Sequence, residues 1–235
     1  MKKKILIVVG ALISGLIIVS GMNNKNNQSV NNFTSDFSNS EKSENKKIIV
    51  EKTPEVITLN GIGQQASNKF QLQKGLSIFK MTHNGSSNFI VNLLDSNGKQ
   101  VGSLVNEIDS FNGGKAENIQ ESGTYILDVT ADGNWTVIIE QPRQITAPDT
   151  TSFSGKGQQT TKLFYMKSGL KTIKMTHNGS SNFIVSLLDS NGKQVDGLVN
   201  EIGSFNGSKA EGVQDNGIYL FDIAADGDWS IDIER

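Results

Sequence analysis

Hydrophobic side chains alternate with polar ones along most of the chain after residue 54. In residues 134–140, for example, Trp135, Val137 and Ile139 occupy every second position. A period of two places these side chains on one face of an extended segment, as in a half-buried antiparallel strand. Such runs, interrupted by turn residues at short intervals, predict an all-β sandwich. No helical periodicity follows the N-terminal segment.

Seven or eight strands are expected in each half of the chain. In the first half they lie near residues 57–60, 69–72, 76–82, 89–94, 101–105, 115–119, 125–131 and 134–140. Asp132-Gly133 predicts a tight hairpin between the last two strands. Asn97-Gly98 predicts a type I′ turn, which needs positive φ angles at both central residues.

The chain contains two copies of one unit. The run MTHNGSSNFIV begins at Met81 and again at Met175, and this offset of 94 residues (175 minus 81) holds throughout without insertion. The copies cover residues 54–141 and 148–235, with a short hinge between them. Units of this length can enclose a core of their own, so we predict two tandem antiparallel β-sandwich domains.

The N-terminal segment is apolar and follows three lysines, Lys2, Lys3 and Lys4. Residues 5–22 carry no charge, which is typical of a secretory signal. At about 1.5 Å per residue they would span about 27 Å as a helix, so residues 1–22 predict either a cleaved signal peptide or a retained membrane anchor. Residues 23–53 are rich in Asn and Ser and predict a disordered, flexible spacer. We therefore expect a secreted or cell-surface protein that contacts the membrane only through this segment.

Composition excludes several kinds of chemistry. Lys and Arg number 22 against 24 Asp and Glu, so the chain has no broad cationic field for nucleic acid. It has no Cys, which excludes disulfides, cysteine-ligated metals and cysteine nucleophiles. Its two histidines are one position in two copies, and the G-x-S-x-G, H-E-x-x-H and P-loop patterns are absent. We expect no enzyme; the alternative is carboxylate-only chemistry such as glycoside hydrolysis, through Asp128 or Glu107.

Three strand–turn–strand runs resemble the prepeptidase C-terminal type of β-sandwich module found in secreted bacterial proteins. They are NFIVNLLDSNGKQV from Asn88, GTYILDVTADGNWTVIIE from Gly123 and GIYLFDIAADGDWSIDIE from Gly217. The resemblance covers most of each unit and implies a jelly-roll-like sandwich. It also implies an accessory role beside a catalytic or adhesive domain, with some members binding a polymer or calcium. No such companion domain is recognised in these 235 residues.

Oxygen-rich loops bind calcium, so the carboxylates near the turns are candidate ligands. Ordinary hairpin chemistry explains an Asp before a Gly equally well, and the run from Asp95 to Gly98 lacks the remaining ligands of an EF-hand loop. We therefore expect no cofactor, with calcium as the alternative. The candidate ligands are Asp95, Asn97, Asp128 and Asp132 in the first copy and Asp189, Asn191, Asp222 and Asp226 in the second.

One block of the repeat is more alike between the copies than the rest. From Met81 to Gly113 they agree at 29 of 33 positions, whereas from Pro54 to Lys80 they agree at 9 of 27. Packing alone preserves apolar character rather than polar identity, so we interpret the block as a polar surface presented twice; recent gene conversion explains it equally well. The candidate binding residues are His83, Asn84, Asn88, Asn106, Glu107, Phe111 and Asn112, and in the second copy His177, Asn178, Asn182, Asn200, Glu201, Phe205 and Asn206.

The aromatic residues bear on glycan binding, which usually needs exposed rings. Trp135 and Trp229 share a strand face with aliphatic residues, which predicts core positions. Phe111 and Phe205 lie in Ser-Phe-Asn-Gly segments, interpreted as loops, where each would be an exposed platform or a plug over the end of the sandwich. The histidine before Asn-Gly is interpreted as a strand-end residue that bonds a loop backbone, with a ligand or pH-switch role as the alternative.

Together these patterns predict an exported, non-catalytic binding or accessory protein. Two similar modules would attach to a surface glycan or an extracellular protein, with avidity from the doubling of one site. The alternative is a structural or assembly component of the cell surface, whose modules contact each other or further copies. The sequence leaves the ligand and the oligomeric state open.

Overall fold

The computed structural model describes residues 52–144 and 146–234, and this part of the chain is all-β. The predicted N-terminal segment and nearly all of the spacer lie outside the described residues. Among those described, no helix is long and apolar enough to cross a membrane. The first repeat forms β1 (Ile57–Ile62), β2 (Gln65–Ala66), β3 (Phe70–Leu72), β4 (Gly75–His83), β5 (Asn88–Asp95), β6 (Gln100–Ile108), β7 (Phe111–Ile119), β8 (Gly123–Thr130) and β9 (Asn134–Glu140).

The second repeat forms the same elements in the same order. They are β10 (Ser152–Lys156), β11 (Gln159–Thr160), β12 (Phe164–Met166), β13 (Gly169–His177), β14 (Asn182–Asp189), β15 (Gln194–Ile202), β16 (Phe205–Val213), β17 (Gly217–Ala224) and β18 (Asp228–Glu234). The expected fold, two tandem antiparallel β-sandwiches, is therefore confirmed.

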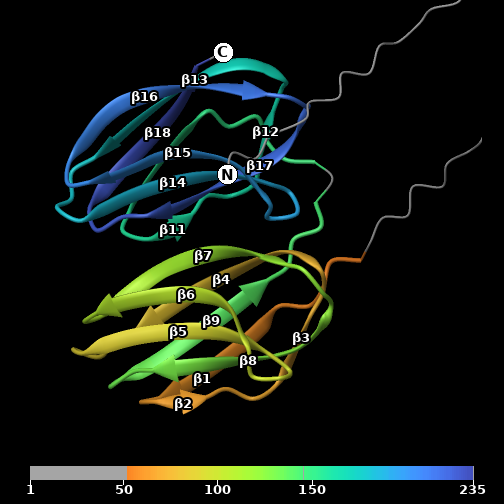
Figure 1. Ribbon diagram of the computed structural model, residues 1–235, viewed down its shortest axis with the longest axis vertical. Coiled ribbons are helices and arrows are strands. Elements are labelled where there is room, and N and C mark those ends of the chain that lie inside the picture. Colours follow the sequence, from red (N-terminus) through yellow and green to blue (C-terminus); the bar gives the residue numbers. More distant parts are fainter. Residues whose placement is uncertain (1–51, 145, 235) are drawn as a thin grey trace, which may run out of the picture. The chain divides into compact units, whose positions relative to one another are not determined.

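Each repeat is a jelly roll built from two facing antiparallel sheets (Figure 1). In the first repeat one sheet has the order β1-β9-β4-β7 and the other β2-β8-β5-β6, with β3 also paired to β8. The second repeat has the orders β10-β18-β13-β16 and β11-β17-β14-β15, with β12 paired to β17. The chain crosses between sheets at almost every connection, and only β5–β6 and β14–β15 are hairpins within one sheet. This is the double Greek-key order of a jelly roll.

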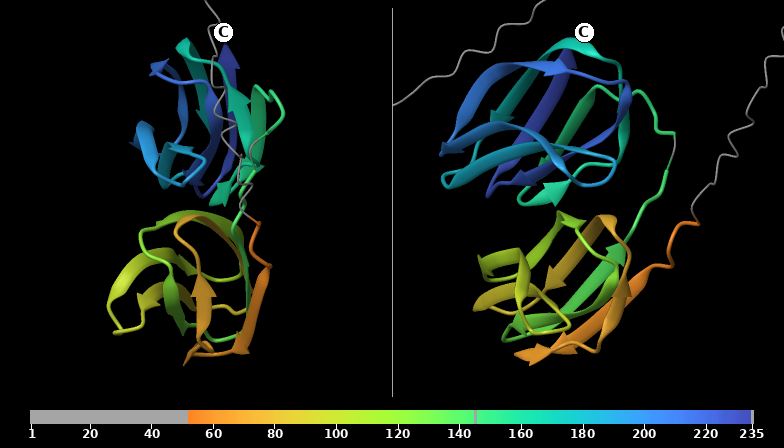
Figure 2. Two further views of the ribbon diagram at one scale, coloured as in Figure 1. Left: turned by 90° about the vertical axis from the view of Figure 1, so that its right-hand side faces the viewer. Right: turned by 45° about the vertical axis from the view of Figure 1, so that its right-hand side comes forward.

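Each sandwich has a hydrophobic core of its own, between the sheets seen in Figure 2. Trp135 is 2% exposed in the first core and Trp229 is 4% exposed in the second. Their indole N–H groups donate to the carbonyl oxygens of Gly63 and Gly157, both at 3.0 Å. The core positions predicted for both tryptophans are confirmed.

The predicted hairpin at Asp132-Gly133 is wrong. The segment joins β8 to β9, and these strands belong to different sheets. Gly133 is needed there because the connection passes close to the β4–β5 loop, and a Cβ on it would lie 2.6 Å from the backbone nitrogen of Gly85. The sequence pattern of two alternating strands around Asp-Gly does not distinguish a hairpin from this arch between sheets.

The turn between β5 and β6 also differs from the prediction. Within this turn only Gly98 has a positive φ, 77°, whereas a type I′ turn needs two such residues, so the predicted turn type is wrong. The Gly98 N–H donates to the carbonyl of Asp95 at 3.0 Å, and the Asp95 N–H donates to that of Lys99 at 2.9 Å. This is a three-residue loop with Gly98 in the left-handed region, the next most common hairpin connection.

Phe111 and Phe205 are strand residues, so the prediction that they lie in loops is wrong. They open β7 and β16, four residues earlier than the alternation of side chains indicated. Each ring is half-buried and packs against its core, with its centroid 5.7 Å from that of Phe89 or Phe183. They close the end of each sandwich as plugs.

The two repeats belong to one compact unit and share a third hydrophobic cluster. Leu76, Ile78 and Ala116, on the outer face of β4 and β7, pack against residues of the second repeat. These are Leu163, which follows β11, and Leu188 and Leu220 on β14 and β17. In the segment between the repeats, expected to act as a hinge, the Arg143 guanidinium donates to the carbonyls of Lys74 and Leu76. The repeats are thus in direct contact.

Candidate functional site

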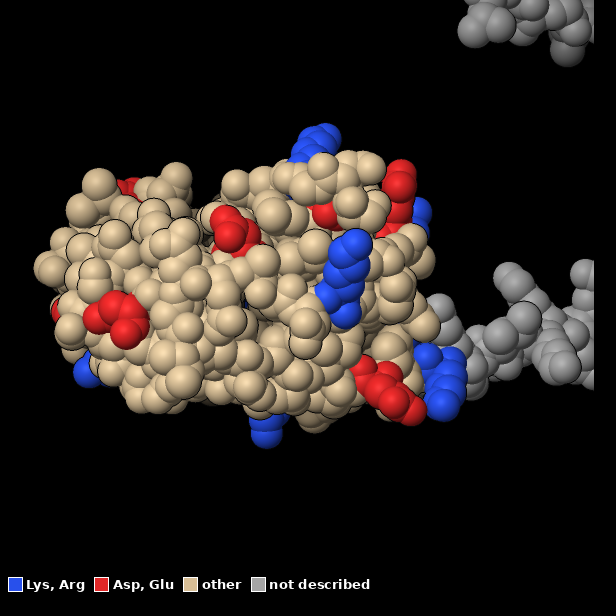
Figure 3. Space-filling view, turned by 90° about the horizontal axis from the view of Figure 1, so that it is seen from below, with Lys and Arg blue, Asp and Glu red and all other residues tan. Residues whose placement is uncertain are grey.

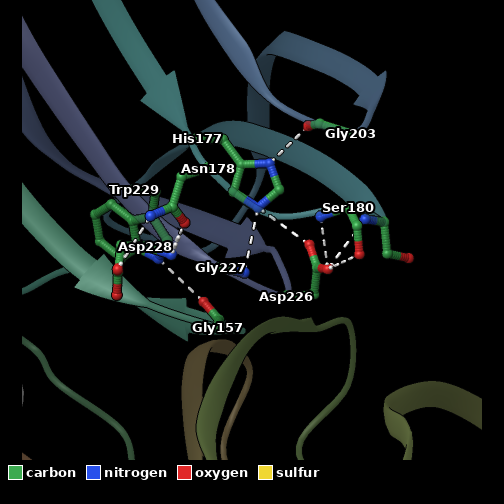
Figure 4. Close-up of polar contacts among 10 residues, drawn as sticks. Gly157, His177, Asn178, Ser180, Gly203, Asp226, Gly227, Asp228 and Trp229 are labelled. Atoms are coloured by element: carbon green, nitrogen blue, oxygen red, sulfur yellow. Dashed lines mark hydrogen bonds and ion pairs between the residues drawn. The ribbon is translucent and has the colours of Figure 1, made fainter.

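The histidine of each repeat lies at the centre of a polar network at the end of β4 or β13. Figure 4 shows it around His177, whose side chain is fully buried. Nδ1 lies 2.8 Å from the carbonyl oxygen of Gly203, and Nε2 lies 3.3 Å from the N–H of Gly227. Because a carbonyl only accepts and an amide N–H only donates, this arrangement fits the neutral tautomer protonated on Nδ1. The interpretation of this histidine as a strand-end residue that bonds a loop backbone is confirmed.

The network continues through an aspartate. Asp226 lies 3.2 Å from His177 Nε2 and accepts hydrogen bonds from the backbone N–H groups of Ser180 and Ser181 and from the Ser180 hydroxyl. The Ser180 N–H holds the pKa of Asp226 below its usual range. Asp132 of the first repeat has the same partner, Ser86, and the same direction of pKa shift.

The order of these groups differs from that of a hydrolytic triad. In a triad the histidine lies between serine and aspartate and takes the serine proton. Here Asp226 lies between Ser180 and His177, so the hydroxyl bonds a carboxylate that also accepts two backbone N–H groups. The geometry suits bracing of the loops rather than activation of a nucleophile.

Four of the fourteen predicted binding residues belong to this bracing. Besides the two histidines, Asn84 accepts the N–H of Asn134 at 2.8 Å, and Asn178 accepts that of Asp228 at 2.7 Å. Their identity between the copies therefore has a structural reason. Sequence reasoning did not separate these residues from the surface set.

The remaining polar candidates lie on exposed strands. Asn88 opens β5, Asn106 and Glu107 end β6, and Asn112 lies near the start of β7; all four side chains are exposed. Their equivalents Asn182, Asn200, Glu201 and Asn206 are exposed on β14, β15 and β16. The two sets occupy equivalent positions on the two sandwiches.

Strands β6 and β15 are edge strands that also expose aliphatic side chains at equivalent positions. Ile108 is 68% exposed and Ile202 is 79% exposed, while Val101 and Val195 are 46% and 45% exposed. We call these four residues, with Asn106, Glu107, Asn200 and Glu201, the edge strips. Each strip is an aliphatic and polar surface on the last strand of its sheet.

The predicted calcium ligands are not gathered into one site. Asp95 and Asp189 accept backbone N–H groups within their own turns, and Asp132 and Asp226 belong to the histidine networks. Asn97 and Asn191 donate their backbone N–H groups to those turns, while Asp128 is exposed on β8. Within the described ranges, no three His, Cys, Asp or Glu side chains come close enough to hold a metal ion. Figure 3 shows charges of both signs scattered over one face without a cluster.

Asp222 has a different role from its exposed equivalent Asp128. It is 7% exposed, lies between the repeats and forms an ion pair with Lys115 Nζ at 2.5 Å. Its other oxygen accepts the N–H of Ala116 at 3.0 Å. Burial of the Lys115 ammonium lowers its pKa, but the charge of Asp222, the hydrogen bond to it and the charge of Glu117 together outweigh burial, so the pKa of Lys115 is raised. Sequence reasoning missed this pair because Lys and Asp occupy these positions in both copies, so nothing in the sequence marks the one pair that meets between the repeats.

Glu117, on the same strand as Lys115, was also not singled out. Burial raises its pKa to about 7; Lys115 acts in the opposite direction and Asp222 in the same direction as burial. A carboxyl group that gains or loses a proton near neutral pH is therefore present beside the contact between the repeats.

Substitution Glu117→Gln is expected to flatten the pH dependence of stability. Because the folded-state pKa lies above the ordinary glutamate value of 4.5, the folded chain holds this proton more tightly, and the free energy of unfolding falls as pH rises from about 5 to about 7. Removing the charge should raise the free energy of unfolding at pH 8 by about 2 kcal/mol. Urea denaturation of both chains at pH 5 and pH 8 measures the difference; an equal gain at both pH values would contradict it.

Comparison with known proteins does not assign the chain to a family. No protein-family model matches the chain, and no curated protein matches it significantly.

Proposed function

We propose that the chain is an exported, non-catalytic protein that attaches to an extracellular protein through its edge strips. The observation that carries the proposal is the repetition, at equivalent positions of both sandwiches, of exposed isoleucine and valine beside exposed Asn and Glu. A single exposed aliphatic residue needs no explanation, but a repeated group on an edge strand has the character of an interaction site.

A protein partner fits these surfaces better than a glycan. Sugar faces pack against exposed aromatic rings, whereas the large hydrophobic side chains exposed in the described ranges are all aliphatic. The tryptophans are in the cores, and Phe111 and Phe205 are half-buried plugs. Apolar residues bordered by polar ones match the arrangement of protein interfaces, in which a polar rim surrounds an apolar core.

The second candidate, a structural or assembly component, is favoured by the direct contact between the repeats. That contact buries an ion pair and a hydrophobic cluster, which is the anatomy of a protein–protein interface. Under this alternative the partner of one module is another module, in the same or a further chain.

Binding of the full chain to purified extracellular matrix proteins and to cell-wall polysaccharides tests the proposal. The double variant Ile108→Asn, Ile202→Asn should weaken retention on a protein at least about tenfold, because each substitution replaces the more exposed aliphatic side chain of a strip with a polar one. Ile62→Asn is the matched control, since Ile62 is 73% exposed but has a lysine as its equivalent in the second repeat.

Three results would contradict the proposal. They are retention on polysaccharides alone, equal weakening by the Ile62 control, and absence of retention on every protein of the panel. Far-UV circular dichroism of each variant separates a lost contact from a lost fold.

A further inference from the structure

The two repeats share one fold, but each contributes a different surface of that fold to the contact between them. The first repeat contributes its edge strand β7, and the second contributes β11 and β17 of its other sheet. Such a heterologous contact leaves each module with one surface unused. The unused surfaces are the β16 edge of the second repeat and the β2–β8 side of the first.

The polar contacts of the used interface satisfy the edge of β7. Asp222 accepts the N–H of Ala116, and the Gln158 carbonyl accepts that of Gly114 at 3.0 Å. The Gln158 side chain donates to the carbonyl of Leu104 at 2.8 Å. An edge strand with free backbone groups is thus covered by the neighbouring module.

The unused surfaces carry the same polar residues. The equivalents of Lys115 and Ala116 are Lys209 and Ala210 on the second repeat, and those of Gln158 and Asp222 are Gln64 and Asp128 on the first. All four retain the residue type. Ala210, Gln64 and Asp128 are exposed, so packing within their own modules does not account for that retention.

The apolar part of the interface is partly retained. Leu170, the equivalent of Leu76, is 72% exposed, and Leu94 and Ile126 replace Leu188 and Leu220. Three other positions are polar on the unused surfaces, where Thr172, Lys69 and Thr124 replace Ile78, Leu163 and Ile218. The unused surfaces therefore carry the same polar contact residues at equivalent positions, but they offer less hydrophobic area for a contact.

An open groove marks the unused edge. It lies beside β15 and β16, has a volume of about 540 Å³ and is lined by Leu198, Ser208 and Lys209 among others. These three residues are the equivalents of Leu104, Gly114 and Lys115, which the second repeat contacts in the first. Lys209 meanwhile forms an ion pair with Asp196, a position that is Gly102 in the first repeat. The second repeat thus supplies its own counter-ion for the lysine on its free edge.

We propose that the β16 edge of one chain binds the β2–β8 side of the first repeat of a second copy, repeating the internal contact head to tail. Lys209 then exchanges Asp196 for Asp128 of the second copy, and Gln64 of that copy enters the groove. Because less apolar area is buried than within the chain, the association is reversible and depends on concentration. A heterologous contact that does not close into a ring gives open chains of molecules. This inference names a second copy of the chain as the partner of the groove, so it goes beyond the proposed attachment and gives the second candidate function, an assembly component, a specific contact.

Cysteine trapping tests the contact, since the chain has no cysteine of its own. A Cβ at Gly114 would lie 3.7 Å from the hydroxyl of Thr160, so this pair of positions is close enough for a disulfide. The equivalent pair between chains is Ser208 and Ala66, and both residues are exposed. Full chains carrying Ser208→Cys and full chains carrying Ala66→Cys are mixed in mild detergent and oxidised.

The expected result is a disulfide-linked heterodimer, formed at least tenfold faster than dimers between chains carrying the same cysteine. A chain with both substitutions should give a ladder of oligomers. Gly114→Cys, Thr160→Cys serves as the positive control and should close within one chain. Adding Asp128→Lys should slow heterodimer formation at least tenfold, whereas Glu55→Lys, the same charge change at an exposed residue outside the proposed ion pair, should not.

Heterodimers that form no faster than same-site dimers, or that are unaffected by Asp128→Lys, would overturn the inference. Such a failure leaves the proposed attachment standing if the Ile108, Ile202 variant still loses binding to the panel. The opposite outcome, trapping without retention on any panel protein, supports the self-contact and contradicts attachment to a foreign protein.

Discussion

Replacing Trp135 by alanine is expected to destabilise the first sandwich by about 3–5 kcal/mol. The indole is 2% exposed, lies in the core with Phe79 and Phe89, and donates its N–H to Gly63. The substitution leaves a cavity and an unpaired carbonyl. A free energy of unfolding of 5–15 kcal/mol is usual for a domain, so the loss is a large part of the total.

The duplication makes this measurement specific. Trp135 and Trp229 are the only tryptophans, and each lies in a different core. In Trp135→Ala, fluorescence therefore reports the second sandwich alone, while far-UV circular dichroism reports both. Urea denaturation should show an early circular-dichroism transition for the first sandwich and a smaller change in the fluorescence midpoint.

Trp229→Ala is the matched experiment with the roles of the sandwiches exchanged. Trp135→Phe keeps an aromatic ring in the core and should cost less than the alanine variant. Coincident fluorescence and circular-dichroism transitions in both alanine variants would show a single cooperative unit and contradict separate core stabilities.

The sequence was sufficient for the elements whose signal is local. Alternation at Trp135, Val137 and Ile139 defined a strand with one buried face, and the offset of 94 residues defined the second module. Both depend on side chains that face their own core. The start of β7 was misplaced because Gly113 and Gly114 interrupt the alternation, although Phe111 already faces the core.

Connections between sheets could not be predicted in the same way. Asp132-Gly133 satisfies the composition of a hairpin, but its geometry depends on Gly85, which is distant in sequence and close in space. The role of His83 at the end of β4 was anticipated, since the residue ends a strand and precedes Asn-Gly. Its partner Asp132 was named only as a candidate ligand for the calcium alternative, because a carboxylate before glycine gives no sign of its partner.

The contact between the repeats was not visible in the sequence for a different reason. Asp222 and Asp128 are the same residue at the same position of the repeat, yet one is buried and the other exposed. Two nearby positions are apolar only in the second copy: Leu163 replaces Lys69, and Ile218 replaces Thr124. A comparison of the copies for apolar gains, rather than for identity, would have indicated the covered face.

Substitution Asp222→Ala is expected to lower the free energy of unfolding by about 2–3 kcal/mol, whereas Asp128→Ala should change it by at most about 0.5 kcal/mol. Removing Asp222 leaves the Lys115 ammonium and the Ala116 N–H without their partner at a covered interface. The expected loss for Asp222→Ala is smaller than for breaking a fully buried ion pair, because the Lys115 side chain is 30% exposed and keeps some contact with water. Urea denaturation of the full chain, with circular dichroism as the signal, measures both variants.

The double variant Lys115→Met, Asp222→Leu separates the two sources of this loss. If the effect of Asp222→Ala comes from leaving a charge unpaired, the apolar pair should recover most of the lost stability, because it needs no desolvation and joins the cluster of Leu76, Ile78 and Leu220. If the hydrogen bond to the Ala116 N–H carries the effect, the double variant should stay as unstable as Asp222→Ala, and Asp222→Asn, which keeps an acceptor, should recover more. Equal losses for Asp222→Ala and Asp128→Ala would contradict the burial of Asp222 between the repeats, and with it the interface on which the head-to-tail contact is patterned.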